Sequence, residues 1–187
     1  MIRTIAGVDE AGRGPLAGPV VAAAVVWKVG DTISGVGDSK SLTCRQRLKA
    51  DVKIRKSSLD WSIGVATPIE IDAFNIHNAT LLAMRRAVLG LRFHVDYALV
   101  DGIYFPDIPL EGETVIKGDK KIGVISAASI LAKVFRDKQM YWIDNIYPNY
   151  GFKKHKGYPT RHHKDMIKKF GPTPEHRMTF SGVKSLP

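Results

Sequence analysis

Two adjacent carboxylates near the start of the chain, Asp9 and Glu10, have the residue types and spacing of a metal site. They end an apolar run and are followed at once by a glycine-rich turn that carries a single cation, Arg13. Ionised carboxylates this close together repel each other and lose hydration, so a cation is needed beside them, and a divalent metal ion meets that need. The stretch over residues 7–20 is therefore a candidate active site.

Two further carboxylates could complete this site. Asp101 ends the apolar stretch 96–101, as Asp9 ends the stretch 4–9, and the ends of neighbouring strands meet at one edge of an α/β sheet. One carboxylate at a strand end is usually a turn former, but two of them beside Glu10 favour a shared site. Asp119 lies in a lysine-rich loop before a long helix, where a solvated charge and a ligand are equally good interpretations.

Glu10 poses a geometric problem, because consecutive strand residues point to opposite faces of a sheet. If Asp9 points to one face, Glu10 should point to the other. Either the strand bends at Glu10, or the longer glutamate side chain reaches around the edge. The sequence leaves both alternatives open.

Four carboxylates without a soft ligand favour Mg²⁺ or Mn²⁺ over Zn²⁺. Two such ions about 4 Å apart can bridge a scissile phosphate, one activating a water molecule and the other stabilising the leaving 3′ oxygen. The charge balance agrees with a phosphate substrate, since 28 Lys and Arg against 18 Asp and Glu give a net charge of +10. Basic residues are dense over 45–56 and 153–169, and the second stretch interleaves aromatic side chains that can stack on sugars or bases.

The glycine turn also matches a dinucleotide-binding pattern, G-x-G-x-x-A, through Gly12, Gly14 and Ala17. That motif must open a helix, whereas this turn leads through prolines into a second apolar strand, which rejects the interpretation. Exposed glycine backbone that approaches a sugar or phosphate closely is the better use of Gly12 and Gly14.

Histidines and a tyrosine in the second basic stretch have competing interpretations. His155, His162 and His163 lie among lysines without a nearby carboxylate or cysteine, which favours phosphate-facing or solvated side chains over a metal site. Tyr158, in H-K-G-Y-P, is equally well a packed loop anchor or a stacking platform for a substrate.

Length and composition bound the class of protein. A chain of 187 residues with 44% hydrophobic residues fits one compact domain. Cys44 is the only cysteine, which excludes a disulfide framework and a thiolate metal site and suits a reducing compartment. The N-terminus lacks a signal-peptide core, and the longest apolar run, 20–27, is shorter than the roughly 20 residues of a membrane span. We expect a cytoplasmic protein without a membrane segment, and no feature demands more than a monomer.

The elements that position these residues follow from apolar patterns and caps. Strands are predicted over 4–9, 20–27, 61–66, 96–101 and 114–116, with the first two antiparallel. Helices are predicted over 44–56, from 67 to 91 with a second cap at Asn75, over 126–146 and up to Phe170 from a cap at Thr160. The first helix should place Leu48, Val52 and Ile54 inward. This order predicts a mixed-sheet α/β domain with a helical C-terminal tail.

Longer motifs along the chain resemble one known family, the prokaryotic type 2 ribonucleases H, or ribonucleases HII. The similar stretches are GVDEAGRGPLAGPVV, DSK at 38–40, NATLLAMRRAV, LVDG, SAASILAKVFRD, YGFKKHKGYPT and FGPTPEHR, which together span nearly the whole length. Type 3 enzymes resemble the chain less, because they usually carry threonine where Arg13 stands and have an additional N-terminal domain.

The resemblance implies an RNase H-like α/β fold: a five-stranded mixed sheet flanked by helices, with a helical C-terminal extension. It divides the chain into a catalytic domain over 1–147 and a C-terminal loop and helical extension over 148–187, within one compact unit. It also implies endonucleolytic hydrolysis of the RNA strand of RNA–DNA hybrids and cutting 5′ of single ribonucleotides embedded in duplex DNA. The products would carry 5′-phosphate and 3′-hydroxyl ends.

The resemblance also assigns expected roles to individual residues. The catalytic, metal-binding carboxylates would be Asp9, Glu10, Asp101 and Asp119, with Mn²⁺ or Mg²⁺ as the cofactor and two ions present with substrate. The G-R-G turn would sense the ribose 2′-hydroxyl, and Tyr158 would stack on the sugar of the following deoxynucleotide, so that together they recognise an RNA–DNA junction. The predicted substrate-binding residues are Gly12, Arg13, Gly14, Tyr158, Lys40 and Lys133.

The chain departs from the family pattern in two places. Ser41 stands where the family commonly has a second lysine, which is expected to weaken one phosphate contact. Residues 102–113 have no assigned counterpart in the family pattern, so the local geometry around Asp101 can differ there while the carboxylate is kept. Two rival functions also fit the residues alone. One is a basic nucleic-acid-binding module whose acidic cluster is structural, and the other is a nuclease for a different polynucleotide, such as a DNA junction.

Overall fold

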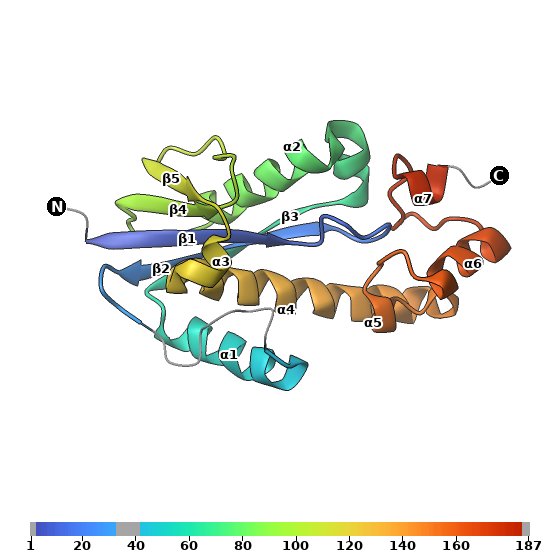
Figure 1. The fold of residues 1–187 in the computed structure, drawn as a ribbon, viewed down its shortest axis with the longest axis horizontal. Coiled ribbons are helices and arrows are strands. Elements are labelled where there is room, and N and C mark those ends of the chain that lie inside the picture. The colour runs from blue at the N-terminus through green and yellow to red at the C-terminus, as the bar shows by residue number, and fades with distance from the viewer. Residues whose placement is uncertain (1–2, 33–41, 185–187) are drawn as a thin grey trace.

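The computed structural model describes residues 3–32 and 42–184 and shows a five-stranded mixed sheet with helices on both faces (Figure 1). The strands are β1 (Thr4–Ala11), β2 (Val20–Lys28), β3 (Asp60–Ala66), β4 (Tyr97–Asp101) and β5 (Gly112–Val115). The helices are α1 (Cys44–Ser57), α2 (Pro68–Leu89), α3 (Gly118–Lys121), α4 (Gly123–Ile146), the 3₁₀ turn η1 (Pro148–Tyr150), α5 (Phe152–His155), α6 (Arg161–Phe170) and α7 (Ser181–Lys184). The predicted fold class is confirmed.

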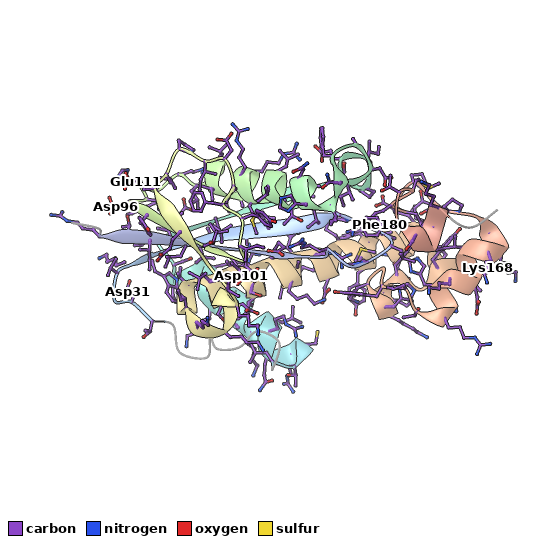
Figure 2. The ribbon with its side chains drawn as sticks, turned by 45° about the horizontal axis from the view of Figure 1, so that its top comes forward. Asp31, Asp96, Asp101, Glu111, Lys168 and Phe180 are labelled. Carbon is purple, nitrogen blue, oxygen red and sulfur yellow. The ribbon has the colours of Figure 1, made fainter. Side chains whose placement is uncertain are left out.

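The strand order is β3-β2-β1-β4-β5, which places β1 at the centre of the sheet. β1 pairs antiparallel with β2, as predicted, and parallel with β4, which brings the C-terminal ends of β1 and β4 to the same edge. Asp101 lies at that edge, near the middle of the long axis of the molecule (Figure 2). The topology therefore brings together two strand ends that are about ninety residues apart in the chain.

Each face of the sheet is covered by one long helix, and alternation along the strands assigns the residues to two cores. Val21, Val25 and Ile5 pack with α4 and α1, whereas Val8 and Val100 pack with α2. A Cβ at Gly7 would collide with the backbone of α4 at Val124, so glycine is required for this helix to lie so close to β1. The close approach brings the side chains of α4 to the carboxyl end of β1.

Helix caps are the best predicted local features. Thr67 and Glu70 form the expected capping box of α2, and the Asn75 side chain accepts from the Asn78 backbone N–H at 3.0 Å, which starts the helix again after a kink. α4 begins at Gly123, three residues before the predicted start, and Ile122 caps it without a side-chain hydrogen bond. Because no capping side chain marks the start of α4, the sequence could not predict its first residue.

The predicted inner face of α1 is wrong in two of its three residues. Leu48 and Val52 are 44% and 66% exposed, whereas Ile54 is buried with Ala50 and Asp51. Asp51 can be buried because its carboxylate pairs with Arg55 at 2.9 Å. The buried face of α1 thus includes an ion-paired carboxylate, which hydrophobicity alone does not indicate.

The C-terminal segments form a separate apolar cluster at one end of the molecule, around Met140, Phe152 and Ile167. Phe180 and Lys168 lie at this end in Figure 2, beyond the carboxyl end of β1. Leu16 and Ala17, from the turn after β1, belong to the same cluster. The glycine turn is therefore held between the sheet and the C-terminal segments. Within the described ranges, no helix has the length and apolar character needed to span a bilayer.

Candidate active site

Three of the four predicted carboxylates converge. Asp9, Glu10 and Asp101 each offer an oxygen atom such that these atoms all lie within 4.8 Å of one another. Asp9 is buried, and the other two are half-buried. Three hard oxygen donors at this spacing fit a divalent cation of the Mg²⁺ or Mn²⁺ type.

The longer side chain of Glu10, and not a bend in the strand, solves the geometric problem posed by the sequence. β1 stays in regular register with β2 through Glu10 and Ala11, so the strand does not turn there. Its pairing with β4 stops at Val8, opposite Val100, which leaves that edge of β1 open. Asp9 lies on the α4 face, and the Glu10 carboxylate reaches around the open edge from the α2 face.

The electrostatics of the cluster favour a bound cation. Burial raises the pKa of Asp9 well above its usual range, and repulsion from Glu10 and Asp101 raises it further. A hydrogen bond from Ser129 and one from the Glu10 backbone N–H, at 2.7 Å, act in the opposite direction. Burial also raises the pKa of Glu10, against the attraction of Arg13, which lies 3.5 Å from its carboxylate. A metal ion would relieve these repulsions.

Asp119 lies beside the cluster but is not one of the three converging residues. It is only 3% exposed, in the one-turn helix α3, so the solvated-loop interpretation is wrong. The backbone N–H of the preceding Gly118 donates to Asp101 Oδ1 at 2.6 Å, which ties α3 to the end of β4. The structure thus places the residue before Asp119 directly against Asp101.

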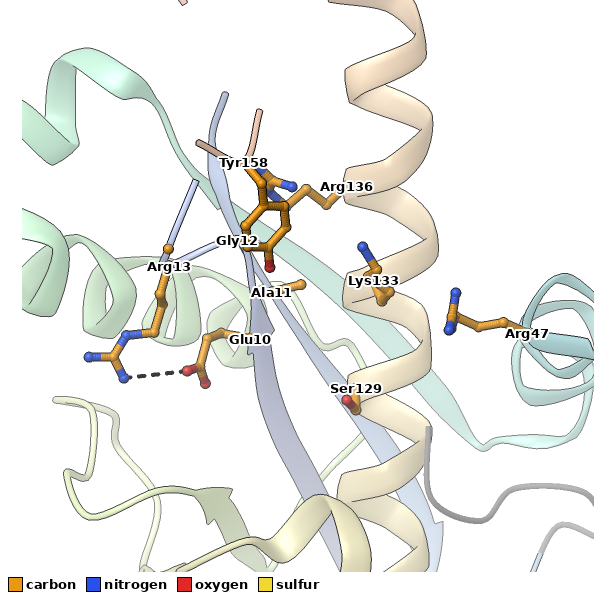
Figure 3. A pocket seen from close by; sticks show the side chains of 10 residues that line it. Glu10, Ala11, Gly12, Arg13, Arg47, Ser129, Lys133, Arg136 and Tyr158 are labelled. Carbon is orange, nitrogen blue, oxygen red and sulfur yellow. Dashed lines mark hydrogen bonds and ion pairs between the residues drawn. The ribbon is translucent and has the colours of Figure 1, made fainter. Parts of the chain in front are cut away.

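A pocket of about 340 Å³ opens beside Glu10 and contains most of the predicted substrate-binding residues (Figure 3). Figure 3 shows α4 as one wall, with Arg47 reaching in from α1 and Tyr158 opposite. The lining residues are Glu10, Ala11, Gly12, Arg13, Gly14, Arg47, Ser129, Lys133, Arg136 and Tyr158. Lys40, the remaining predicted contact, lies outside the described residues.

The G-R-G turn is held by a buried arginine that the sequence did not single out. Arg177 donates to the carbonyl oxygens of Gly12 at 2.6 Å, Arg13 at 2.9 Å and Gly18 at 2.8 and 3.0 Å. Gly12 has φ +98°, and a Cβ there would collide with the Arg136 side chain. Glycine is therefore required at this position by both conformation and space.

Arg136, a second buried arginine, extends from α4 and holds the backbone that follows the turn and the backbone beside Tyr158. It donates to the carbonyl oxygens of Pro19 at 2.9 Å, Lys156 at 3.0 Å and Ala17 at 3.1 Å. Burial lowers the pKa of Arg136 to about 10 and that of Arg177 to about 9. Within residues 3–32 and 42–184, neither guanidinium has an ion-pair partner. Both charges are thus satisfied by backbone carbonyls of the loops that build the pocket.

Tyr158 and Lys133 differ in how freely they can meet a substrate. The Tyr158 ring is 45% exposed and lies against the turn, since a Cβ at Gly14 would be 3.7 Å from its Cε1. Lys133 is half-buried and paired with Asp137 at 2.7 Å, one helical turn along α4. A phosphate contact by Lys133 would share its ammonium with that carboxylate.

The interpretation of the histidines was wrong for two of three. His162 is exposed, as predicted, but His163 is fully buried and His155 is half-buried. The His163 ring contacts His176, which lies in the C-terminal stretch without clear periodicity. Both ring nitrogens of His155 and of His163 are hydrogen-bonded within the protein, which leaves neither ring a nitrogen to bind phosphate.

Comparison with known proteins agrees with this fold and site. The family model for Ribonuclease HII matches residues 6–183. A curated relative, Ribonuclease HII of Vibrio parahaemolyticus, is 48% identical over 180 residues, which covers 96% of this chain and 85% of that protein. The crystal structure of ribonuclease H2 from Pyrococcus horikoshii OT3 superposes with a TM-score of 0.83 at 28% identity and covers 97% of this chain and 95% of its own. The RNase HII of the PCNA:RNase HII complex from Archaeoglobus fulgidus has a TM-score of 0.79 at 25% identity, with 97% and 96% covered.

The fold and the converging carboxylates thus define a hydrolase of the ribonuclease H class. Within that class, the chain belongs to the ribonuclease HII family. It is therefore a ribonuclease H that acts as an endoribonuclease on RNA–DNA hybrids. The ribonuclease H family is dependent on divalent metal ions, and the donor set of Asp9, Glu10 and Asp101 fits such an ion.

Proposed function

We propose that this ribonuclease H cuts both the RNA strand of hybrids and the 5′ side of single ribonucleotides in duplex DNA, leaving 5′-phosphate and 3′-hydroxyl ends. The observation that carries the proposal is one pocket in which Glu10 adjoins the G-R-G turn and Tyr158. A nuclease that selects one ribonucleotide must inspect the sugar beside the bond it cuts. Here the cutting residues and the inspecting residues are neighbours.

The residues proposed to hold the metal are Asp9, Glu10, Asp101 and Asp119, with Mn²⁺ or Mg²⁺ as the ion and two ions present with substrate. The metal would supply an activated water molecule and stabilisation of the leaving 3′ oxygen. Asp9 is held in place for this task by Ser129 and the Glu10 backbone N–H. Arg13, paired with Glu10 and half exposed, can turn toward a phosphate when the carboxylate binds a cation.

Recognition of the sugar is assigned to Gly12, Arg13, Gly14 and Tyr158. Arg177 donates hydrogen bonds to the carbonyl oxygens of the turn, so the geometry of the turn is fixed before substrate binds. The exposed Tyr158 ring, which lies against Gly14, is suited to stack on the sugar that follows the ribose. Lys133 and Lys40 are proposed phosphate contacts, the second on sequence grounds alone.

We further propose that residues 148–187 form one compact unit with the catalytic domain 1–147. The cluster that joins Leu16 and Met140 to Phe152 and Ile167 supports this. We also propose that the enzyme acts in the cytoplasm and as a monomer, in line with the bacterial ribonucleases HII that it resembles.

The test compares three duplexes of one sequence: a continuous hybrid, a DNA duplex with one ribonucleotide, and an all-DNA duplex. With Mg²⁺ or Mn²⁺, wild-type enzyme should cut the first two and spare the third. Asp101→Asn should lose cleavage, while Asp107→Asn, which changes a carboxylate that is 94% exposed, should retain it. Cleavage of all-DNA duplex at a comparable rate would contradict the proposal.

The proposed contact between the metal and the scissile phosphate has its own test. A stereopure phosphorothioate at the scissile phosphate should slow cleavage strongly with Mg²⁺ and recover with Mn²⁺, because sulfur is a poor ligand for the harder ion. Equal inhibition with both metals for each stereoisomer would argue against direct metal contact.

A further inference from the structure

Two buried histidines connect the C-terminal segment to the Tyr158 loop. His163 and His176 are 0% and 1% exposed, and their Nε2 atoms lie 3.0 Å apart. Both belong to segments that follow helix α4, and neither lines the pocket of Figure 3. Their hydrogen bonds determine which nitrogen of each ring carries the proton.

The two histidines belong to a chain of hydrogen bonds, and its first end is a backbone amide. The Thr173 N–H donates to His176 Nδ1 at 2.8 Å, and because an amide N–H can only donate, Nδ1 must be unprotonated. In a neutral ring the proton is then on Nε2, from which His176 donates to Nε2 of His163.

The second end is a backbone carbonyl. His163 Nδ1 lies 2.9 Å from the carbonyl oxygen of Tyr158, and because a carbonyl can only accept, Nδ1 must carry the proton. Nε2 of His163 is then the acceptor that His176 requires. The two ends thus fix the same direction of donation independently: Thr173 to His176, His176 to His163, and His163 to Tyr158.

A third histidine fixes the loop from its other side. The Gly157 N–H donates to His155 Nδ1 at 3.2 Å, so His155 donates from Nε2 to the Tyr150 carbonyl at 2.8 Å. The His155 ring stacks on His163 with centroids 4.5 Å apart. The Tyr158 N–H donates to the His155 carbonyl at 2.9 Å, and the Tyr158 carbonyl also accepts from the Thr160 N–H at 2.8 Å.

The same C-terminal segment fixes the other half of the pocket. Arg177, the residue after His176, binds the carbonyl oxygens of Gly12 and Arg13. The Leu16 N–H donates to the Gly157 carbonyl at 2.8 Å, which joins the glycine turn to the loop of Tyr158. Two adjacent residues therefore reach in different directions to the two elements that face the substrate.

We propose that His176 and His163 are positioning residues for Tyr158, and that segment 173–177 sets the spacing between Tyr158 and the G-R-G turn. This spacing determines preference for a ribonucleotide followed by a deoxynucleotide over continuous RNA. The choice of substrates rests on the proposed function, whereas the directed imidazole chain does not. A chain of neutral donors and acceptors holds an exposed ring at a fixed place without adding charge beside the phosphates.

The direction of the hydrogen bonds through His176 and His163 can be tested without any substrate. Long-range ¹H–¹⁵N spectra of the full-length enzyme near pH 7.5, assigned with single histidine variants, should show the Nδ1–H tautomer for His163 and the Nε2–H tautomer for His176. The reverse tautomer at either ring, or a charged imidazole, would overturn the proposal.

The positioning role is tested by substitutions that keep or remove one donor. His176→Gln retains an amide donor at the place of Nε2, and His176→Leu removes it. His176→Leu should lower kcat/KM for a duplex with one ribonucleotide by about fivefold to tenfold, the worth of one buried hydrogen bond. The loss should appear mainly in KM and be less than about twofold on a continuous hybrid, where no deoxyribose follows the cut.

Three controls make the outcome decisive. His176→Gln should recover most of the single-ribonucleotide activity, and Tyr158→Ala should reproduce the substrate preference of His176→Leu. His94→Leu, which changes a histidine whose side chain is 86% exposed and lies outside the pocket, should match wild type. Unchanged kinetics for His176→Leu, or an equal loss on both substrates, would overturn the positioning role.

If His176→Leu fails to fold, His163→Asn replaces it as the test variant. Its amide keeps a donor toward the Tyr158 carbonyl but loses the hydrogen bond with His176, so the preference for the single ribonucleotide should be partly lost. No loss of this preference would count against the role. Wild-type enzyme that cuts neither substrate would refute the proposed function instead, and the tautomer spectra would then decide the imidazole chain alone.

Discussion

Replacing Asp9 by asparagine should stabilise the metal-free fold while abolishing cleavage. Asparagine has nearly the same shape, and its carbonyl oxygen can still accept from the Glu10 N–H, now at 2.7 Å from Asp9 Oδ1. What it removes is a buried negative charge that faces Glu10 and Asp101. Stability and activity should therefore move in opposite directions.

The magnitude follows from the spacing of the carboxylates. Charges 4.8 Å apart repel by about 3.5 kcal/mol per pair at an effective dielectric constant of 20, and Asp9 faces two partners. Arg13 and solvent at the open edge of β1 reduce this repulsion, and burial together with the two neighbouring carboxylates raises the pKa of Asp9, so the net effect is smaller than the bare Coulomb figure. We expect Asp9→Asn to raise the free energy of unfolding by about 1–3 kcal/mol, or Tm by roughly 3–10 °C for a chain of this size.

The assay is thermal or urea unfolding in the presence of a chelator, with Asp107→Asn as the matched control because its carboxylate is 94% exposed. Added Mn²⁺ should stabilise wild-type enzyme and narrow the difference, since a ligand that binds only the folded state stabilises it by mass action. A metal-free Asp9→Asn variant less stable than wild type, with Asp107→Asn unchanged, would refute the reasoning about repulsion.

Other parts of the site carry further predictions. Gly12→Ala should lower cleavage at least tenfold with Mn²⁺ binding by calorimetry unchanged, because φ +98° and the Arg136 side chain leave no room for a Cβ; retained activity would contradict this. Arg177→Met should lower the urea-derived free energy of unfolding by about 3 kcal/mol or more, since several buried carbonyls lose their donor, and a loss below about 1 kcal/mol would contradict the role of the guanidinium. Burial lowers the pKa of His163 and His176 to about 4 from 6.5, so the unfolded chain binds more protons between these values and stability should fall as pH drops from about 6.5 toward 4. Urea midpoints at pH 7.5 and 5.0 test this. If the midpoint falls by the same amount between these pH values in wild-type enzyme and in His163→Asn, the result would argue against it.

The parts of the fold that depend on local chemistry could be predicted from the sequence. Thr67 and Thr43 cap helices where their side chains allow it, and the apolar runs that end in Asp9 and Asp101 are neighbouring strands. Periodicity and capping are properties of a few consecutive residues, so a sequence displays them directly.

The rest depends on which segments pack together. Arg136 and Arg177 are buried because distant loops offer them carbonyl oxygens, and the neighbouring residues in the sequence carry no sign of that. The only available signal was their place in the two motifs SAASILAKVFRD and FGPTPEHR. Asp119 was ambiguous for the same reason, since only the tertiary fold buries it.

The proposed function rests on Glu10, one of the three converging carboxylates, lining the same pocket as the G-R-G turn and Tyr158. The most direct test maps the products of a DNA duplex with one embedded ribonucleotide on a denaturing gel, with Mn²⁺ present. We expect a single cut on the 5′ side of that ribonucleotide, a 5′-phosphate on the fragment that contains it, and no product from Asp9→Asn. A cut at another position, or cleavage by Asp9→Asn at the wild-type rate, would contradict the proposed function.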